Sequence, residues 1–236
     1  MVKIETLTNK YSSFQENLCN LYIKSQEILI LFNNEGGKEI RFTHINILAG
    51  QIAVSLKNLE INILYFKKHN KEFNAIFNSN TKQIDNYFYG LAENITENIV
   101  EVFLFQSELI FRFYYSKMQN EFMGKEKNLY KIFATLFNDI ENNWTTKECK
   151  LLVLLWTARN VIHTGGIYYQ KQQGVSLKYK NKNYHFVFGK APEFIMKGLI
   201  LDLINDLFDV TKKLFLSRKI KRLAYFEHPS YLALDK

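Results

Sequence analysis

The stretch KECKLLVLLWTARNVIH, residues 147–163, is apolar on every side when it is wound into a helix. A capping-box pattern, S/T-x-x-E, opens it at residues 145–148, and the two glycines Gly165 and Gly166 follow it. A helix that is hydrophobic all round is stable only where neighbouring elements cover each of its faces. The sequence therefore predicts a helix over residues 147–163 at the centre of a helical bundle.

The regions on either side of this stretch repeat apolar residues every three or four positions, which is typical of amphipathic helices. One of these regions contains Gly90, and we expect the helix to break near that glycine. The periodicity predicts further helices over residues 12–32, 43–69, 83–120, 125–140 and 192–219.

A single β signal lies between the central stretch and the last helix. Residues 175–180 and 184–188 alternate apolar and polar side chains, and Lys-Asn-Lys-Asn at 180–183 is expected to make the turn. With only 2 prolines and 10 glycines in 236 residues, the chain lacks the turns of an all-β fold. We expect a mainly α fold: one domain over residues 1–236, with five or six helices and a small β-hairpin inserted before the last helix.

The cysteines and the hydropathy of the chain indicate in which cellular compartment the protein is expected. Cys19 and Cys149 are the 2 cysteines of the chain, and their separation fits neither a disulfide framework nor a zinc site. No apolar stretch reaches the roughly 20 residues that span a bilayer. We therefore expect a soluble cytoplasmic protein without a membrane partner.

Positive charge is concentrated in the carboxy-terminal part of the chain. Residues 150–192 hold seven basic side chains and no acidic one, and residues 210–226 hold six more without an acid. Since the net charge of the whole chain is +8, the remainder is net negative. This distribution, with its basic tail at 212–236, favours a polyanionic partner, most commonly nucleic acid. A solvated lysine-rich face that only maintains solubility remains the alternative.

Three polar residues end the otherwise apolar central stretch: Arg159, Asn160 and His163. Arg159 and His163 are four positions apart, so a helix places them on one face, where they can meet one small anion. The alternative is structural. Arg159 would then pair with an internal carboxylate such as Asp139 or Glu148, and His163 would interact with the helix dipole.

This segment resembles the signature of the HEPN superfamily, helical proteins that include many metal-independent ribonucleases of toxin–antitoxin and antiphage systems. The family pattern is an arginine, an adjacent polar residue and, after four to six intervening positions, a histidine; here three positions separate Arg159 from His163. The hairpin region that follows, within residues 147–190, is also similar to a group of HEPN-like bacterial proteins.

The resemblance implies a catalytic set of Arg159, Asn160 and His163. His163 would act on the ribose 2′-hydroxyl, Arg159 would stabilise the phosphate and Asn160 would orient the site. Histidine suits this role because its ordinary pKa, about 6.5, lies near neutrality. The resemblance further implies RNA as substrate, no metal, no cofactor, a homodimer whose site is shared between two chains, and a cognate antitoxin or defence partner.

The predicted hairpin supplies four candidate RNA-binding residues: Lys178, Lys180, Lys182 and His185. Two interpretations of the protein remain open at this point. One is a HEPN-like endoribonuclease, a hydrolase of RNA. The other is a non-catalytic HEPN-like module that binds RNA, a nucleotide or a partner protein, and the short spacing from Arg159 to His163 favours it.

Overall fold

Helices make up most of the computed structural model, which describes residues 4–32, 39–77, 80–137, 146–196 and 199–221. Within these residues the mainly α fold, with a two-stranded hairpin ahead of the last long helix, is confirmed. The longer helices are α1 (Ile4–Ile30), α2 (Ile40–Lys68), α4 (Thr81–Gln119), α5 (Leu129–Phe137), α6 (Lys147–His163) and α8 (Ile200–Phe215). The shorter elements are α3 (Asn70–Ile76), β1 (Val175–Tyr179), β2 (Lys182–Phe186), α7 (Glu193–Met196) and α9 (Arg218–Lys221).

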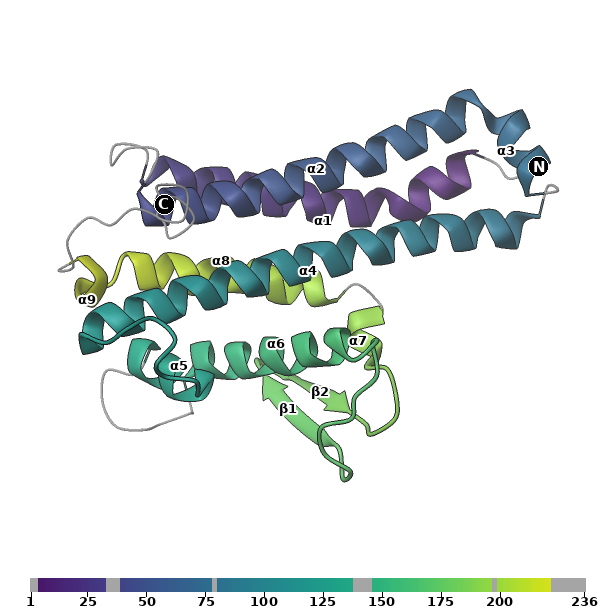
Figure 1. Cartoon of the computed structure of the whole chain (residues 1–236). Coiled ribbons are helices and arrows are strands. Elements are labelled where there is room, and N and C mark those ends of the chain that lie inside the picture. The colour runs from purple at the N-terminus through teal and green to yellow at the C-terminus, as the bar shows by residue number, and fades with distance from the viewer. Residues whose placement is uncertain (1–3, 33–38, 78–79, 138–145, 197–198, 222–236) are drawn as a thin grey trace.

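The helices are arranged in layers (Figure 1). The antiparallel pair α1 and α2 forms one side, α4 and α8 lie in the middle, and α5 and α6 form the other side. The hairpin packs against the outer face of α6. Helix α6 therefore contacts α4, α5, α8 and β1, which cover most of its surface, but it lies in an outer layer of the bundle and not at the centre as predicted.

Burial of α6 on all sides follows from its sequence. Leu151, Leu152, Leu154 and Leu155 are fully buried, and Trp156 is 4% exposed. Each such side chain contributes about 1.5–3 kcal/mol when it leaves water. The apolar faces of α4, α5, α8 and the hairpin are thus held together largely by this one helix.

Both ends of α6 are closed by local hydrogen bonds. At the start, the hydroxyl of Thr146 accepts from the backbone N–H of Cys149 at 3.3 Å. The prediction placed the cap at residue 145, which lies outside the described residues. At the end, Gly165 has φ +75°, and the N–H groups of Gly165 and Gly166 donate to the carbonyls of Ile162 and Val161. This Schellman arrangement favours glycine because other residues resist positive φ.

The hairpin differs from the prediction in its turn. Lys182 pairs with Tyr179, so the turn contains only Lys180 and Asn181, and residues 182–183 belong to β2. Lys180 has φ +51°, which allows the chain to reverse within two residues. The shorter turn also lets the Tyr179 hydroxyl and the Lys180 ammonium both reach Asp206 on α8, at 3.1 and 2.7 Å.

The structure differs from the sequence prediction in two helical regions. Helix α4 passes through Gly90 without a break because Ile84 and Phe88 are buried in a cluster with α1, α2 and α3, which outweighs the roughly 1 kcal/mol cost of a helical glycine. The single helix expected over residues 192–219 is divided into α7, α8 and α9. The Ser217 hydroxyl accepts from the N–H of Ile220 and starts α9 anew.

Helix α2 is long and apolar enough to cross a membrane by length and composition, alone among the described helices. Core helices of soluble proteins meet the same criteria, and α2 packs against α1 and α4. Of the basic tail expected at residues 212–236, the described part, up to residue 221, consists of the end of α8, a turn at residues 216–217 and α9.

The burial of α6 predicts a strong dependence of stability on its leucines. Leu154→Ala is expected to lower the free energy of unfolding by about 2–5 kcal/mol, because Leu154 is fully buried and a cavity would remain. Leu64→Ala on α2 is the matched control: Leu64 is 62% exposed, so its loss should cost less than about 0.5 kcal/mol. Urea denaturation of both variants measures the difference, and equal costs would contradict a central role for α6.

Candidate functional site

The end of α6 presents the three motif residues on different parts of its surface. Arg159 and His163 are four positions apart, which corresponds to about 40° around the helix, so they share a face. Asn160 is turned away from Arg159 by about 100°. The side chain of Arg159 is 25% exposed, whereas Asn160 and His163 are exposed. The structure thus brings Arg159 and His163 together and places Asn160 beside them on another side of α6.

Arg159 faces a carboxylate of the neighbouring helix α4. Its Nη1 lies 3.7 Å from Oε2 of Glu108, an ion-pair distance that is too long for a direct hydrogen bond. The same oxygen accepts from the indole N–H of Trp156 at 3.3 Å. Glu108 is therefore the internal partner of Arg159, in place of the two acids named from the sequence. Glu148 instead forms an ion pair with Lys213 at 2.5 Å, and residue 139 lies outside the described residues.

A second arginine shares the Glu108 carboxylate. Nε of Arg112 donates to Oε1 of Glu108 at 2.8 Å, and Nη1 of Arg112 donates to the carbonyl of Glu126 at 2.6 Å. The three side chains are partly buried, with 25%, 20% and 18% exposure for Arg159, Arg112 and Glu108. Two guanidinium groups facing one carboxylate leave one unit of positive charge in a partly desolvated position.

This Arg–Glu–Arg cluster can accept an anion. Arg112 uses its donors on Glu108 and on a backbone carbonyl, whereas Arg159 makes the longer contact to Glu108 and has a side chain that is 25% exposed. A guanidinium has five N–H donors in a planar fork that matches a phosphate. Arg159 is therefore the member of the cluster that can bind a phosphate while Arg112 continues to neutralise Glu108.

The four hairpin residues expected to bind RNA do not lie on one surface. Lys180 is held by Asp206, with Nζ–O distances of 2.7 and 2.9 Å to its two carboxylate oxygens. Lys182 and His185 line a pocket of about 640 Å³ beside β2, together with Lys190. Lys178 lines a different pocket, on the other side of the hairpin. Lys182 and His185 thus line one pocket, whereas the strand register, which pairs His185 with Ser176, places His185 on the same face of the hairpin as Lys178.

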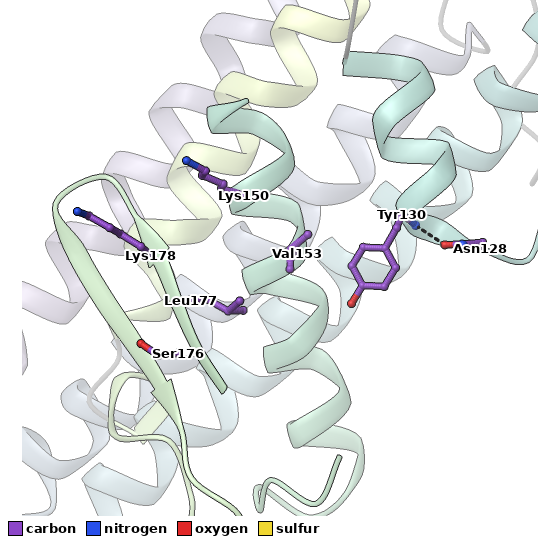
Figure 2. Close-up of a pocket in the computed structure, with 7 residues that line it drawn as sticks. All are labelled: Asn128, Tyr130, Lys150, Val153, Ser176, Leu177 and Lys178. Atoms are coloured by element: carbon purple, nitrogen blue, oxygen red, sulfur yellow. Dashed lines mark hydrogen bonds between the residues drawn. The ribbon is translucent and has the colours of Figure 1, made fainter. Parts of the chain in front are cut away.

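The pocket that contains Lys178 also contains residues that the sequence analysis did not select. It measures about 590 Å³ and lies between α5, α6 and β1. Lys150 of α6 and Tyr130 of α5 contribute to it (Figure 2). Neither this pocket nor the one beside β2 is lined by Arg159 or His163.

Glu108 and Arg112 are the principal site residues that sequence reasoning missed. They appear in the sequence only as polar interruptions of an apolar stretch on α4. Their spacing of four residues signals an intrahelical ion pair, but nothing in the sequence indicates that α6 brings Arg159 to the same carboxylate. Among the residues that the structure describes, no group of three or more His, Cys, Asp or Glu side chains is placed to hold a metal ion.

Comparison of the chain with protein-family models, with curated proteins and with solved structures finds no match.

The unequal distances in the Arg–Glu–Arg cluster predict unequal coupling energies. Double-mutant cycles should give about 1 kcal/mol for Glu108 with Arg112, which share a short hydrogen bond, and less than about 0.5 kcal/mol for Glu108 with Arg159. Denaturation of Glu108→Gln, Arg112→Met, Arg159→Met and the two double variants measures both terms. A larger coupling to Arg159 would mean that this arginine is chiefly structural.

Proposed function

We propose that this protein is an RNA-cleaving enzyme, a metal-independent endoribonuclease that acts in the cytoplasm, with His163 and Arg159 as catalytic residues. The observation that supports it is the pairing of an exposed histidine with a partly exposed arginine on one face of α6. The uncompensated charge of the Arg–Glu–Arg cluster favours an anion at the same place. The resemblance of Arg159, Asn160 and His163 to the HEPN signature supports the same chemistry.

The reaction uses a nucleophile that belongs to the substrate. His163 accepts the proton of a ribose 2′-hydroxyl, the 2′-oxygen attacks the adjacent phosphorus, and the bond from phosphorus to the 5′-oxygen breaks. Arg159 stabilises the negative charge that develops on the phosphate oxygens. The 5′-oxygen leaves with a proton from a general acid, so the products are a 2′,3′-cyclic phosphate and a 5′-hydroxyl end.

The proposed reaction also needs a general acid that protonates the 5′-oxygen. In the proposal a second copy contributes it, so that His163 of one chain acts as base and His163 of the other as acid across a homodimer. Such a shared site would form only after association, which agrees with the exposed position of His163 on α6. Control of the enzyme by an antitoxin or another defence component is part of the same proposal.

The proposal predicts cleavage that depends on two residues. Purified protein in excess EDTA should cleave single-stranded RNA and leave cyclic-phosphate ends, and His163→Ala should reduce the rate at least about 100-fold. Arg159→Ala should reduce it by a similar factor through loss of phosphate stabilisation. His69→Ala is the matched control, since His69 lies between α2 and α3, on the opposite side of the bundle from α6. Gel analysis of end-labelled RNA measures the rates, and wild-type activity in His163→Ala would refute the assignment.

A second candidate function, RNA binding without cleavage, is favoured by two observations. The contact between Arg159 and Glu108 gives the arginine a structural role, and Lys182, His185 and Lys190 converge on one pocket beside β2. In this case phosphates would be held at the hairpin, and the motif on α6 would stabilise the fold.

Salt dependence distinguishes the two candidates. For the binding module, RNA affinity should fall with salt at a slope of about −0.7 per phosphate contact in a plot of log K against log salt. Lys182→Ala combined with Lys190→Ala should reduce the magnitude of that slope by about 1 to 2. The control, Lys67→Ala combined with Lys68→Ala, removes the same charge at the end of α2 and should leave the slope unchanged. Fluorescence anisotropy with labelled oligouridylate measures the slopes. An unchanged slope in the hairpin variant would reject this surface.

A further inference from the structure

The pocket between α5, α6 and β1 lies away from the proposed catalytic face. Lys150, on its rim, and Arg159 are nine residues apart on α6, which corresponds to about 180° around the helix axis. The pocket measures about 590 Å³, within the range of small-molecule sites. A ligand held there would therefore not occupy the Arg–Glu–Arg cluster.

The inner surface of this pocket is apolar. Figure 2 shows Val153 of α6 between Leu177 of β1 and the ring of Tyr130 of α5, so three elements contribute to one apolar wall. Val153 and Leu177 are half-buried, and Tyr130 is 44% exposed. Such a wall favours an aliphatic or aromatic body over the hydrated backbone of a nucleic acid.

Two ammonium groups lie at one side of this wall. Figure 2 shows Lys150 and Lys178 on the same side of the pocket, next to the apolar residues. Both are exposed, and within the described residues neither forms an ion pair or a side-chain hydrogen bond. Other lysines nearby have acidic partners, Lys180 with Asp206 and Lys213 with Glu148. Among the residues that the structure describes, no acidic side chain is thus paired with the positive charge of these two lysines.

The backbone N–H groups at the start of α5 that Asn128 caps are not free to bind an anion. The side-chain oxygen of Asn128 accepts from the N–H groups of Tyr130 and Lys131 at 3.0 and 3.4 Å and caps the helix. The lysines, together with the Ser176 hydroxyl on the pocket wall, are therefore the groups that would bind an anion.

We propose that this pocket binds a small amphipathic anion: an aliphatic or aromatic body of about ten carbon atoms that carries one carboxylate or phosphate group. The body packs on Val153, Leu177 and Tyr130, and the anionic group lies between Lys150 and Lys178. This inference does not depend on the proposed ribonuclease activity, since it uses a different face of α6.

Calorimetric titration with decanoate tests the proposal. Decanoate should bind the wild type, and Lys150→Met with Lys178→Met should raise its Kd about tenfold, because the substitution removes both charges and keeps the apolar stems. Lys67→Met with Lys68→Met carries the same loss of charge at the end of α2 and should bind as the wild type does. Decanol and decylammonium should bind the wild type more weakly than decanoate does. Their affinity for the Lys150→Met, Lys178→Met variant should be no lower than their affinity for the wild type.

A second variant tests the apolar wall. Val153→Trp should fill the pocket and abolish decanoate binding while both lysines remain, with thermal unfolding used to verify that the variant is folded. Wild-type affinity in both variants would overturn the proposal. An aromatic sulfonate bound to the pocket serves as a competition probe. If oligouridylate displaces this probe and decanoate does not, the pocket is an RNA site and the proposal is overturned. The RNA-cleavage assay on Val153→Trp gives a separate readout, since filling the pocket should leave cleavage unchanged.

Discussion

Covering α6 on every side is the constraint from which the other features of the structure follow. A helix with four fully buried leucines and a buried tryptophan cannot lie at a surface, so α4, α5, α8 and the hairpin pack around it. Its two ends must then satisfy their backbone groups locally, which Thr146 and Gly165 achieve. The motif residues lie at the carboxy-terminal end of this helix, where it meets solvent. The position of the site is thus a consequence of how the core is built.

The same packing gives Arg159 two roles. A guanidinium beside an apolar helix needs a counter-charge, and Glu108 on α4 provides it. Because Arg112 already engages that carboxylate more closely, the neutralisation of Arg159 is incomplete. The arginine in this state links two helices, and in the proposed reaction it would also bind a phosphate. Substitution of Arg159 would then affect both the fold and the proposed reaction, so a variant of His163 reports more directly on the proposed chemistry.

Positive charge on residues 150–190 is divided by the fold into separate surfaces. Asp206 of α8 neutralises the tip of the hairpin through Lys180. Lys150 and Lys178 remain on one side of the hairpin, and Lys182 and Lys190 remain on the other. The basic region that looks continuous in the sequence is thus divided between two pockets, one lined by Lys150 and Lys178 and the other by Lys182 and Lys190.

The sequence by itself determined the helical class, the buried helix α6 and the hairpin, because burial on all sides, three-to-four periodicity and strict alternation are local patterns. It also placed Arg159 and His163 on one face, since helix geometry fixes neighbours four residues apart. It misjudged the break at Gly90 and the turn at residues 180–183, where contacts with distant elements outweigh local preference. Only the tertiary structure decided that Glu108 faces Arg159, that Asp206 forms an ion pair with Lys180, and that Lys150 and Lys178 lie on the same side of one apolar pocket. Each of these pairs joins residues on different elements, and their proximity depends on how those elements pack, which no local pattern specifies.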